Sequence, residues 1–257
     1  MKMSSVAHLT VVGLVALAAC GDDTDEGVRP RDYIRADDFR KLVLEVDYVD
    51  GYAPASPPER IIAQLTAILD KPDGIELTLD DTLTSASGQA WSVEALTDLM
   101  DEVYDLPVDE ATIKIHTIVV DGHYEQDTAD GKVLGLSWGG RRVALFGETI
   151  RTLCQGSLPA IRTLACNATL NSVWMHEIGH LLGLVDNGLP MVTDHLDPDA
   201  SHGKHDASPD CLMHWETNTG KVIQRVVAAI QAGHGESPLA FDAACQSDIA
   251  ALRERTP

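Results

Sequence analysis

The segment from His176 to Asp186 carries the residues whose types and spacing best fit a metal site. His176 and His180 lie four positions apart. Because an α-helix turns once in about 3.6 residues, both imidazoles point to one side of a helix. Such a pair can bind one zinc ion, and Glu177 lies beside the metal as a candidate general base. Gly183 stands where the helix should break, with positive φ, and Asp186 stands where a third ligand is due. The spacing predicts a zinc site of His176, His180 and Asp186.

Two other residues are alternatives for the third ligand. His195 would take the place of Asp186 if the following loop folded back, and Glu216 would supply a carboxylate from a later helix. Asp186 also has a purely structural interpretation, as a cap of the helix end or of the turn that follows it.

The loop over residues 186–210 is polar and rich in histidine. A second, structural metal is conceivable there, with His202 and His205 as ligands and Cys211 joining as a thiolate. The alternative interpretation is a solvated loop at the rim of the cleft.

Hydrophobic periodicity predicts the elements that position these residues. We expect strands over residues 41–49, 75–79, 112–120, 133–138 and 142–146, the last two joined as a hairpin across Gly139-Gly140. We expect helices over 59–69, from Ser92 onward, over 168–185 for the zinc helix, and over 220–231 and 238–253. Mixed strands and helices followed by a helical end predict α/β or α+β layers.

The N-terminus has the pattern of a targeting segment. Lys2 precedes an apolar stretch that is too short for a comfortable membrane span, and Leu17-Ala18-Ala19-Cys20 resembles a bacterial lipobox. We therefore expect residues 1–19 to be a lipoprotein signal peptide, Cys20 to carry lipid, residues 20–37 to be a flexible acidic tether, and residues 38–257 to be the catalytic domain. The chain would be exported and held on the bacterial cell membrane by acyl chains alone.

The composition limits the classes of partner. The 257 residues include 19 basic and 40 acidic ones, for a formal charge of −21, and 44% are hydrophobic, enough for a true core. So acidic a chain argues against nucleic acid and anionic membrane surfaces and fits a peptide or protein substrate. Oligomeric state does not follow from these numbers.

Four cysteines remain once Cys20 is set aside. An even number in an exported chain suggests two disulfides, and three pairings are possible. We favour Cys154–Cys166 and Cys211–Cys245. A metal role for Cys211 would compete with the second of these pairs.

The same residues resemble the metzincin zinc proteases. These carry H-E-x-x-H-x-x-G-x-x-[HD] followed by a tight turn with a methionine under the metal, matched here by His176 to Asp186 and by Met213 in Cys211-Leu212-Met213. The chain looks most similar to bacterial membrane-anchored metalloproteases over residues 170–216, and loosely over 145–150. The first 110 residues give little family signal.

The resemblance implies an α+β fold: a mixed twisted sheet over an active-site helix, a helical C-terminal part and a Met-turn in which Met213 is a structural floor. It implies a zinc-dependent endopeptidase in which Glu177 is the general base for a zinc-activated water. Most metzincins have histidine where this chain has Asp186. Several have tyrosine where this chain has Trp215, so the tyrosine's role does not transfer.

Two other functions remain open. One is a hydrolase of the same type with a narrow non-protein or cell-wall peptide substrate. The other is a metal-stabilised, non-catalytic cell-surface binding lipoprotein, against which the intact Glu177 argues.

Overall fold

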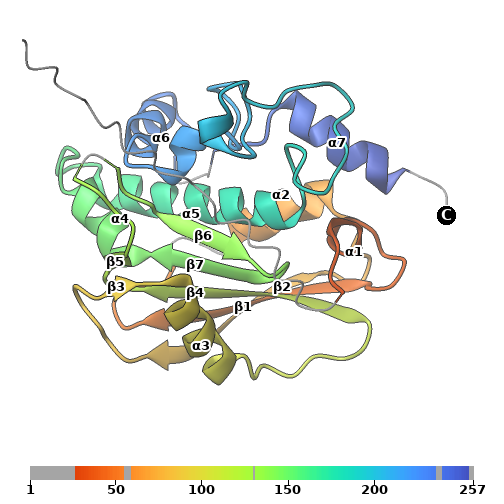
Figure 1. The fold of residues 1–257 in the computed structure, drawn as a ribbon, viewed down its shortest axis with the longest axis horizontal. Helices are drawn as coiled ribbons and strands as arrows, with labels where there is room; N and C mark the ends of the chain where they lie inside the picture. Colours follow the sequence, from red (N-terminus) through yellow and green to blue (C-terminus); the bar gives the residue numbers. More distant parts are fainter. Residues whose placement is uncertain (1–26, 55–58, 130, 236–238, 255–257) are drawn as a thin grey trace, which may run out of the picture.

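The computed structural model describes residues 27–54, 59–129, 131–235 and 239–254 and has a five-stranded central sheet in the order β2-β1-β4-β7-β6 (Figure 1). Its strands are β1 (Lys41–Val49), β2 (Ile75–Leu83), β4 (Thr112–Val120), β6 (Gly135–Trp138) and β7 (Arg142–Phe146). β1 pairs in parallel with β2 and β4, and β4 pairs in parallel with β7. β6 is antiparallel to β7 and forms one edge. A small second sheet joins β3 (Ala90–Trp91) to β5 (His123–Tyr124).

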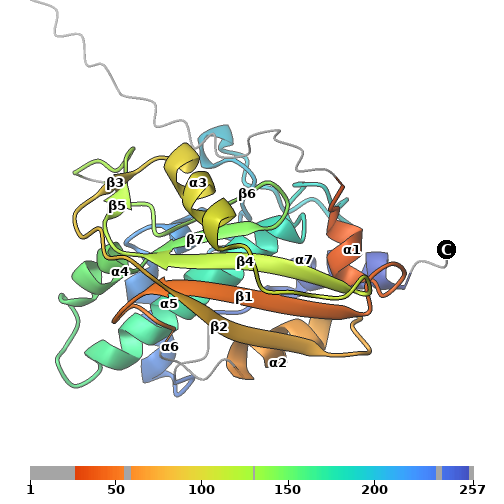
Figure 2. The same ribbon diagram turned by 90° about the horizontal axis from the view of Figure 1, so that it is seen from below.

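Helices cover both faces of the sheet unequally. The described residues form α1 (Pro30–Ile34), α2 (Glu59–Ile68), α3 (Val93–Val103), α4 (Gly147–Cys154), α5 (Arg162–Leu181), α6 (Val222–Gln231) and α7 (Ala243–Arg253), with short 3-10 turns η1 (Ala200–His202) and η2 (Trp215–Asn218). Figures 1 and 2 place α3 on one face, and α4, α5 and α2 on the other, with α6 and α7 beyond α5. The fold is therefore a layered, mixed α/β structure.

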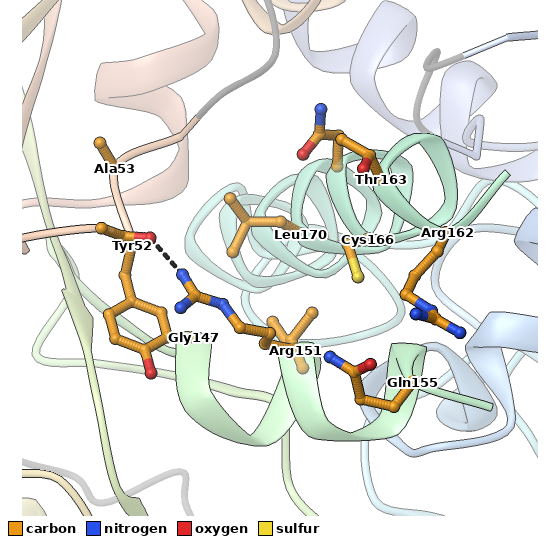
Figure 3. Close-up of a pocket in the computed structure, with 12 residues that line it drawn as sticks. Tyr52, Ala53, Gly147, Arg151, Gln155, Arg162, Thr163, Cys166 and Leu170 are labelled. Carbon is orange, nitrogen blue, oxygen red and sulfur yellow. Dashed lines mark hydrogen bonds between the residues drawn. The ribbon is translucent and has the colours of Figure 1, made fainter. Parts of the chain in front are cut away.

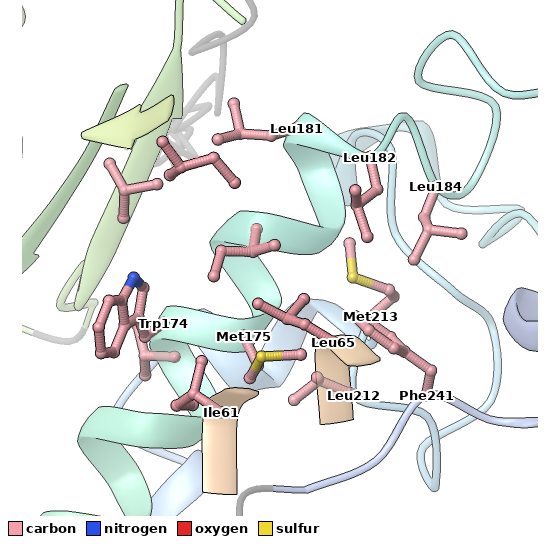
Figure 4. Packing of buried hydrophobic residues seen from close by; sticks show 14 of the residues in the cluster. Ile61, Leu65, Trp174, Met175, Leu181, Leu182, Leu184, Leu212, Met213 and Phe241 are labelled. Atoms are coloured by element: carbon pink, nitrogen blue, oxygen red, sulfur yellow. The ribbon is translucent and has the colours of Figure 1, made fainter. Parts of the chain in front are cut away.

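The main core lies between the sheet and α5. All nine residues of β4 are buried, as expected for a central strand of a parallel sheet covered on both faces. Trp174 of α5 is buried and its indole Nε1 donates to Thr117 Oγ1 of β4 at 3.0 Å, which satisfies two buried polar groups. Figure 4 shows Met213 and Phe241 packing on α5 together with other core side chains. This packing fixes the helix that carries the histidine pair.

The sequence predicted most of these elements. β1, β4 and β7 match the expected ranges residue for residue, and Ser92 caps α3 by accepting from the Ala95 amide at 3.1 Å. The hairpin across Gly139-Gly140 is present. α5 begins six residues before the expected start, at Arg162, and α1 and α4 are helices beyond the expected ones.

The folded domain begins earlier than expected. Part of the expected tether, residues 30–34, forms α1, in which Tyr33 and Ile34 are fully buried. Pro30 packs just beyond the end of α5, where a Cβ on Gly183 would lie 2.6 Å from Pro30 Cγ. Apolar contacts thus tie this segment to the core. The signal segment and Cys20 lie outside the described residues, and no helix within them is long and apolar enough to cross a bilayer.

Gly179 is the point at which α5 approaches the C-terminal part most closely. A Cβ there would overlap Met213 Sδ and lie 3.0 Å from Phe241 Cε1. We predict that Gly179→Ala lowers the free energy of unfolding by about 1–3 kcal/mol through overpacking, measured by urea denaturation. Gly156→Ala is the matched control, because its Cβ would meet only Leu153 O at 3.6 Å. Equal effects of the two substitutions would contradict this account of the contact.

Candidate metal centre

Helix α5 places His176 and His180 on neighbouring turns. Their ring centroids are 4.8 Å apart at an interplanar angle of 89°, and His176 is fully buried while His180 is partly exposed. The predicted convergence of the two imidazoles is therefore present.

His205 completes a cluster of three imidazoles. One ring nitrogen from each of His176, His180 and His205 lies within 4.8 Å of the others. The His205 ring is 5.1 Å from that of His176 and 4.9 Å from that of His180. A loop residue that follows α5 by more than twenty positions thus joins the helical pair.

Backbone carbonyls set the proton positions on two of these rings. His176 Nδ1–H donates to Leu212 O at 2.8 Å, and His205 Nδ1–H donates to His202 O. Each neutral ring then has an unprotonated Nε2, and these two Nε2 atoms face each other at 3.2 Å. Two lone pairs at this distance repel each other unless a cation lies between them.

The donor set fits zinc. Two nitrogens that bind one tetrahedral zinc at about 2.0–2.1 Å lie about 3.3 Å apart, close to the spacing here. His180 Nδ1 is buried and has no hydrogen-bond partner within the described part of the chain. Imidazole nitrogens are ligands that zinc prefers, and backbone carbonyls orient two of the three rings, as is usual in zinc sites.

Burial keeps the cluster uncharged. Desolvation, assisted by the neighbouring histidine His205, lowers the pKa of His176 to about 3, and desolvation lowers the pKa of His205 to about 4. The pKa of His180 also lies well below its usual value, first through burial and then through the neighbouring histidines. A low proton affinity at neutral pH leaves the lone pairs of these nitrogens available to a metal ion.

The structure does not bring Asp186 to the histidine pair. Asp186 follows Val185, and both residues have φ of +57°, a conformation that is strained for a β-branched residue. The chain turns outward there, and the exposed Asp186 carboxylate pairs with Lys204 Nζ at 2.6 Å. Asp186 thus pairs with the residue next to His205 and is not a member of the group of three histidines.

The other proposed third ligands are also engaged elsewhere. His195 lies between two carboxylates, with Nδ1 2.6 Å from Asp206 Oδ2 and Nε2 2.8 Å from Asp248 Oδ2. Burial opposes protonation of His195, but these two hydrogen bonds raise its pKa above the usual value. Glu216 pairs with Lys221 Nζ at 2.7 Å. Neither residue is in the histidine cluster.

The conceived second metal site does not form from its expected members. His205 belongs to the first cluster, and His202 Nδ1 bonds to Asp197 Oδ2 at 2.7 Å. Cys211 lies instead beside Cys245.

The two expected disulfides are likewise absent. All four cysteines among the described residues are free thiols, with Cys211 Sγ and Cys245 Sγ 3.6 Å apart. The partners in the second favoured pair, Cys211 and Cys245, do lie side by side. For this pair the correction concerns the covalent bond and not the proximity.

Glu177 lies under the edge strand. It is only 1% exposed, and its Oε2 accepts from Ser137 Oγ of β6 at 2.8 Å, whereas its Oε1 is buried with no partner in the described ranges. Burial raises the pKa of Glu177 to about 8, against the smaller lowering effect of Ser137. Asn218 fixes β6 above it, donating from Nδ2 to Gly135 O at 2.8 Å and accepting at Oδ1 from the Gly135 amide at 2.8 Å.

Trp215 and Met213 lie in different surroundings: Trp215 contacts the loop residue His202, and Met213 packs against α5. Trp215 stacks on His202 at a centroid distance of 4.2 Å, with Lys221 Nζ 4.5 Å from the centre of its ring. Met213 is fully buried against α5, beside Leu212, whose carbonyl orients His176.

Comparison with known proteins adds two distant similarities of fold. No protein-family profile and no curated protein matches the chain. Archaemetzincin from Methanopyrus kandleri superposes with a TM-score of 0.49 at 13% identity, over 84% of this chain and 97% of that one. Metalloproteinase-II from Bacteroides fragilis superposes with a TM-score of 0.42 at 14% identity, over 87% of this chain and 57% of that one. Both TM-scores lie below 0.5, so these similarities carry no inference about function.

His205 is the residue that distinguishes this ligand set from the one expected from the sequence. We predict that His205→Ala weakens zinc binding by more than about 100-fold, because ligand loss exceeds the usual cost of losing a supporting contact. Competition titration with a chelating dye measures this. Asp186→Ala and the exposed control His234→Ala should retain zinc. Loss of zinc in Asp186→Ala with retention in His205→Ala would restore the ligand set expected from the sequence.

Proposed function

We propose that this chain is a zinc-dependent endopeptidase of the metzincin type, with His176, His180 and His205 as metal ligands and Glu177 as general base. The supporting observation is the pair of unprotonated Nε2 atoms that face each other at 3.2 Å, next to a glutamate on the same helix. The motif H-E-x-x-H-x-x-G, continued by a methionine packed under α5, supports the metzincin assignment. In this proposal Met213 is the structural floor of the histidine pair.

The three histidines would hold the metal and leave a further coordination position open for solvent or substrate. When bound, zinc supplies Lewis acidity, which polarises a peptide carbonyl and makes a water molecule acidic near neutral pH. His180 is the partly exposed member of the cluster, so substrate would approach on its side.

Glu177 has the features that a proton-transferring residue needs. Ser137 holds Oε2, which leaves Oε1 as the oxygen that accepts and returns a proton. A pKa near neutrality lets one carboxyl group take a proton from water and give it to a leaving amine. Ser137 and Asn218 would act as positioning residues, because they set the carboxylate and the strand above it.

The burial of Glu177 also favours a second candidate function. A carboxyl group that is 1% exposed fits a chain in which the metal stabilises the fold and no turnover occurs, such as a cell-surface binding protein. The two functions differ in what the glutamate does once zinc is bound.

Glu177→Gln separates the two candidates. We predict that this variant retains zinc and loses peptide cleavage by about 100-fold or more, as expected when a general base is removed. Cleavage of a peptide library by the purified protein, with and without chelator, measures this. Glu216→Gln is the matched control and should cleave normally. Undiminished cleavage by Glu177→Gln would exclude Glu177 as the base, and no cleavage by the unaltered zinc-loaded protein would favour the binding function.

We further propose that the chain is exported and anchored through lipid on Cys20, which rests on the lipobox pattern alone. Partition of the expressed protein into detergent, abolished by Cys20→Ser, would support the anchor. A chain that stays in the aqueous phase with Cys20 intact would refute it.

A further inference from the structure

The loop that brings His205 to the helical histidine pair is not held in place by apolar burial. The structure describes every residue from 190 to 204, and none of them is buried. His205 and Asp206 are the first buried residues after Leu189. Because burial of apolar surface is the main force that fixes a segment in a fold, the position of His205 must depend on polar contacts.

Two stretches of this loop pair with each other in an antiparallel manner. The amide of Asp197 donates to His205 O at 2.8 Å, and the amide of Ala207 donates to His195 O at 2.9 Å. This pairing places residues 195–197 directly beside His205.

The side chain of His195 ties the paired stretches to helix α7. Its Nδ1 is 2.6 Å from Asp206 Oδ2, and its Nε2 is 2.8 Å from Asp248 Oδ2, a contact that spans 53 residues. The two carboxylate side chains are 0% and 1% exposed. Both ring nitrogens face acceptors, so the ring satisfies both carboxylates only when both nitrogens donate, as in the imidazolium. One cation therefore links the residue after His205 to α7.

Each carboxylate also holds the loop through its other oxygen. Asp248 Oδ1 accepts from the Val192 amide at 2.6 Å, and Asp206 Oδ1 accepts from the Ser208 amide at 2.7 Å. Without the His195 ring, two buried carboxylates would lose their shared cation. Since an unpaired buried charge is costly, the loop would have to move and admit water.

We propose that His195 is a positioning residue of the metal centre, which fixes His205 opposite the two histidines of α5 by tying Asp206 to Asp248. This inference rests on the proposed function, in which His205 is the third zinc ligand. His195 is not a member of the histidine cluster and acts through Asp206 and through the backbone beside His205.

The sheet contains a matched contact away from the metal centre. His116 Nε2 of β4 lies 2.7 Å from Asp47 Oδ2 of β1, and these side chains are 1% and 0% exposed. The His116 ring lies 5.2 Å from that of Tyr104, the residue that caps the end of α3. α3 and α5 cover opposite faces of the sheet (Figures 1 and 2), so this pair reports the cost of losing a buried histidine–carboxylate contact alone.

Zinc affinity tests the role of His195. We expect His195→Gln to weaken zinc binding by about 10- to 100-fold, the usual effect of removing a group that orients a ligand. Competition titration of the full chain with a chelating dye at pH 7 measures this. His116→Gln should lower the urea midpoint of unfolding and retain the zinc affinity. In the Co²⁺-loaded protein, the visible absorption bands should change in His195→Gln and stay unchanged in His116→Gln, because only the first substitution alters ligand geometry.

Asp248→Asn tests the same link from α7 and remains informative if His195→Gln does not fold. The asparagine keeps an oxygen for the Val192 amide but removes the carboxylate oxygen that faces His195. We expect Asp248→Asn to weaken zinc binding, whereas the matched Asp47→Asn should not. The double variant His195→Gln/Asp248→Asn should bind zinc no more weakly than His195→Gln, because both substitutions break one contact.

A further control lies near the other end of α5. A cavity of about 290 Å³ lies there between α4, α5 and residues 51–53 (Figure 3). At its wall the Arg151 guanidinium donates to Gly51 O and lies 3.8 Å from the centre of the Tyr52 ring. Arg151→Met removes one cation and one long-range contact, as His195→Gln does, and should retain zinc affinity.

Three results would overturn the proposal. One is unchanged zinc affinity in both His195→Gln and Asp248→Asn. Another is an equal loss of affinity in His195→Gln and His116→Gln, which would reduce the effect to general stability. The third is a loss in His195→Gln as large as in His205→Ala with Asp248→Asn unaffected, which would make His195 a ligand. None of these readouts requires peptide cleavage, so a protein that binds zinc as expected without cleaving peptides would contradict the proposed function alone.

Discussion

The proposed metal centre depends on two imidazole nitrogens held face to face without a proton between them. Their separation of 3.2 Å would be a hydrogen bond if either Nε2 carried hydrogen, but both rings donate from Nδ1 to backbone carbonyls. Protonating either buried ring is costly, as the lowered pKa values of His176 and His205 show. A divalent cation would remove the repulsion and use both lone pairs, which is the physical basis of the proposed metal site.

The supporting structure consists of backbone groups and close packing. The carbonyl that orients His176 belongs to Leu212, directly before Met213, and Met213 packs where α5 has only Gly179. Residue 179 must be small so that the turn containing Met213 can approach α5 closely. One contact between α5 and the turn of Leu212 and Met213 therefore does two things. It orients His176 and it requires a residue without a side chain at Gly179.

Helix α5 lies in two different electrostatic surroundings along its length. Near its C-terminal end, burial lowers the pKa of His176 and raises the pKa of Glu177; near its N-terminal end, Cys166 lines a cavity together with Arg151 and Arg162. The helix itself imposes neither property. Desolvation dominates where the sheet and the C-terminal part cover the helix, and nearby cations have more influence where a cavity leaves it open.

The sequence alone determined what local periodicity and spacing can specify. It specified β1, β4 and β7 to the residue and the convergence of His176 and His180, since each follows from side-chain direction within one element. It did not specify α1, whose Tyr33 is buried by tertiary contacts and donates from its hydroxyl to Gly140 O at 2.8 Å, more than a hundred residues away. The third histidine was decided by tertiary structure as well: the long loop after α5 returns His205, and not Asp186 or His195, to the helical pair. The ion pair between Asp186 and Lys204 spans 18 residues and the contact between His195 and Asp248 spans 53, and contacts at such separations leave no periodic trace in the sequence.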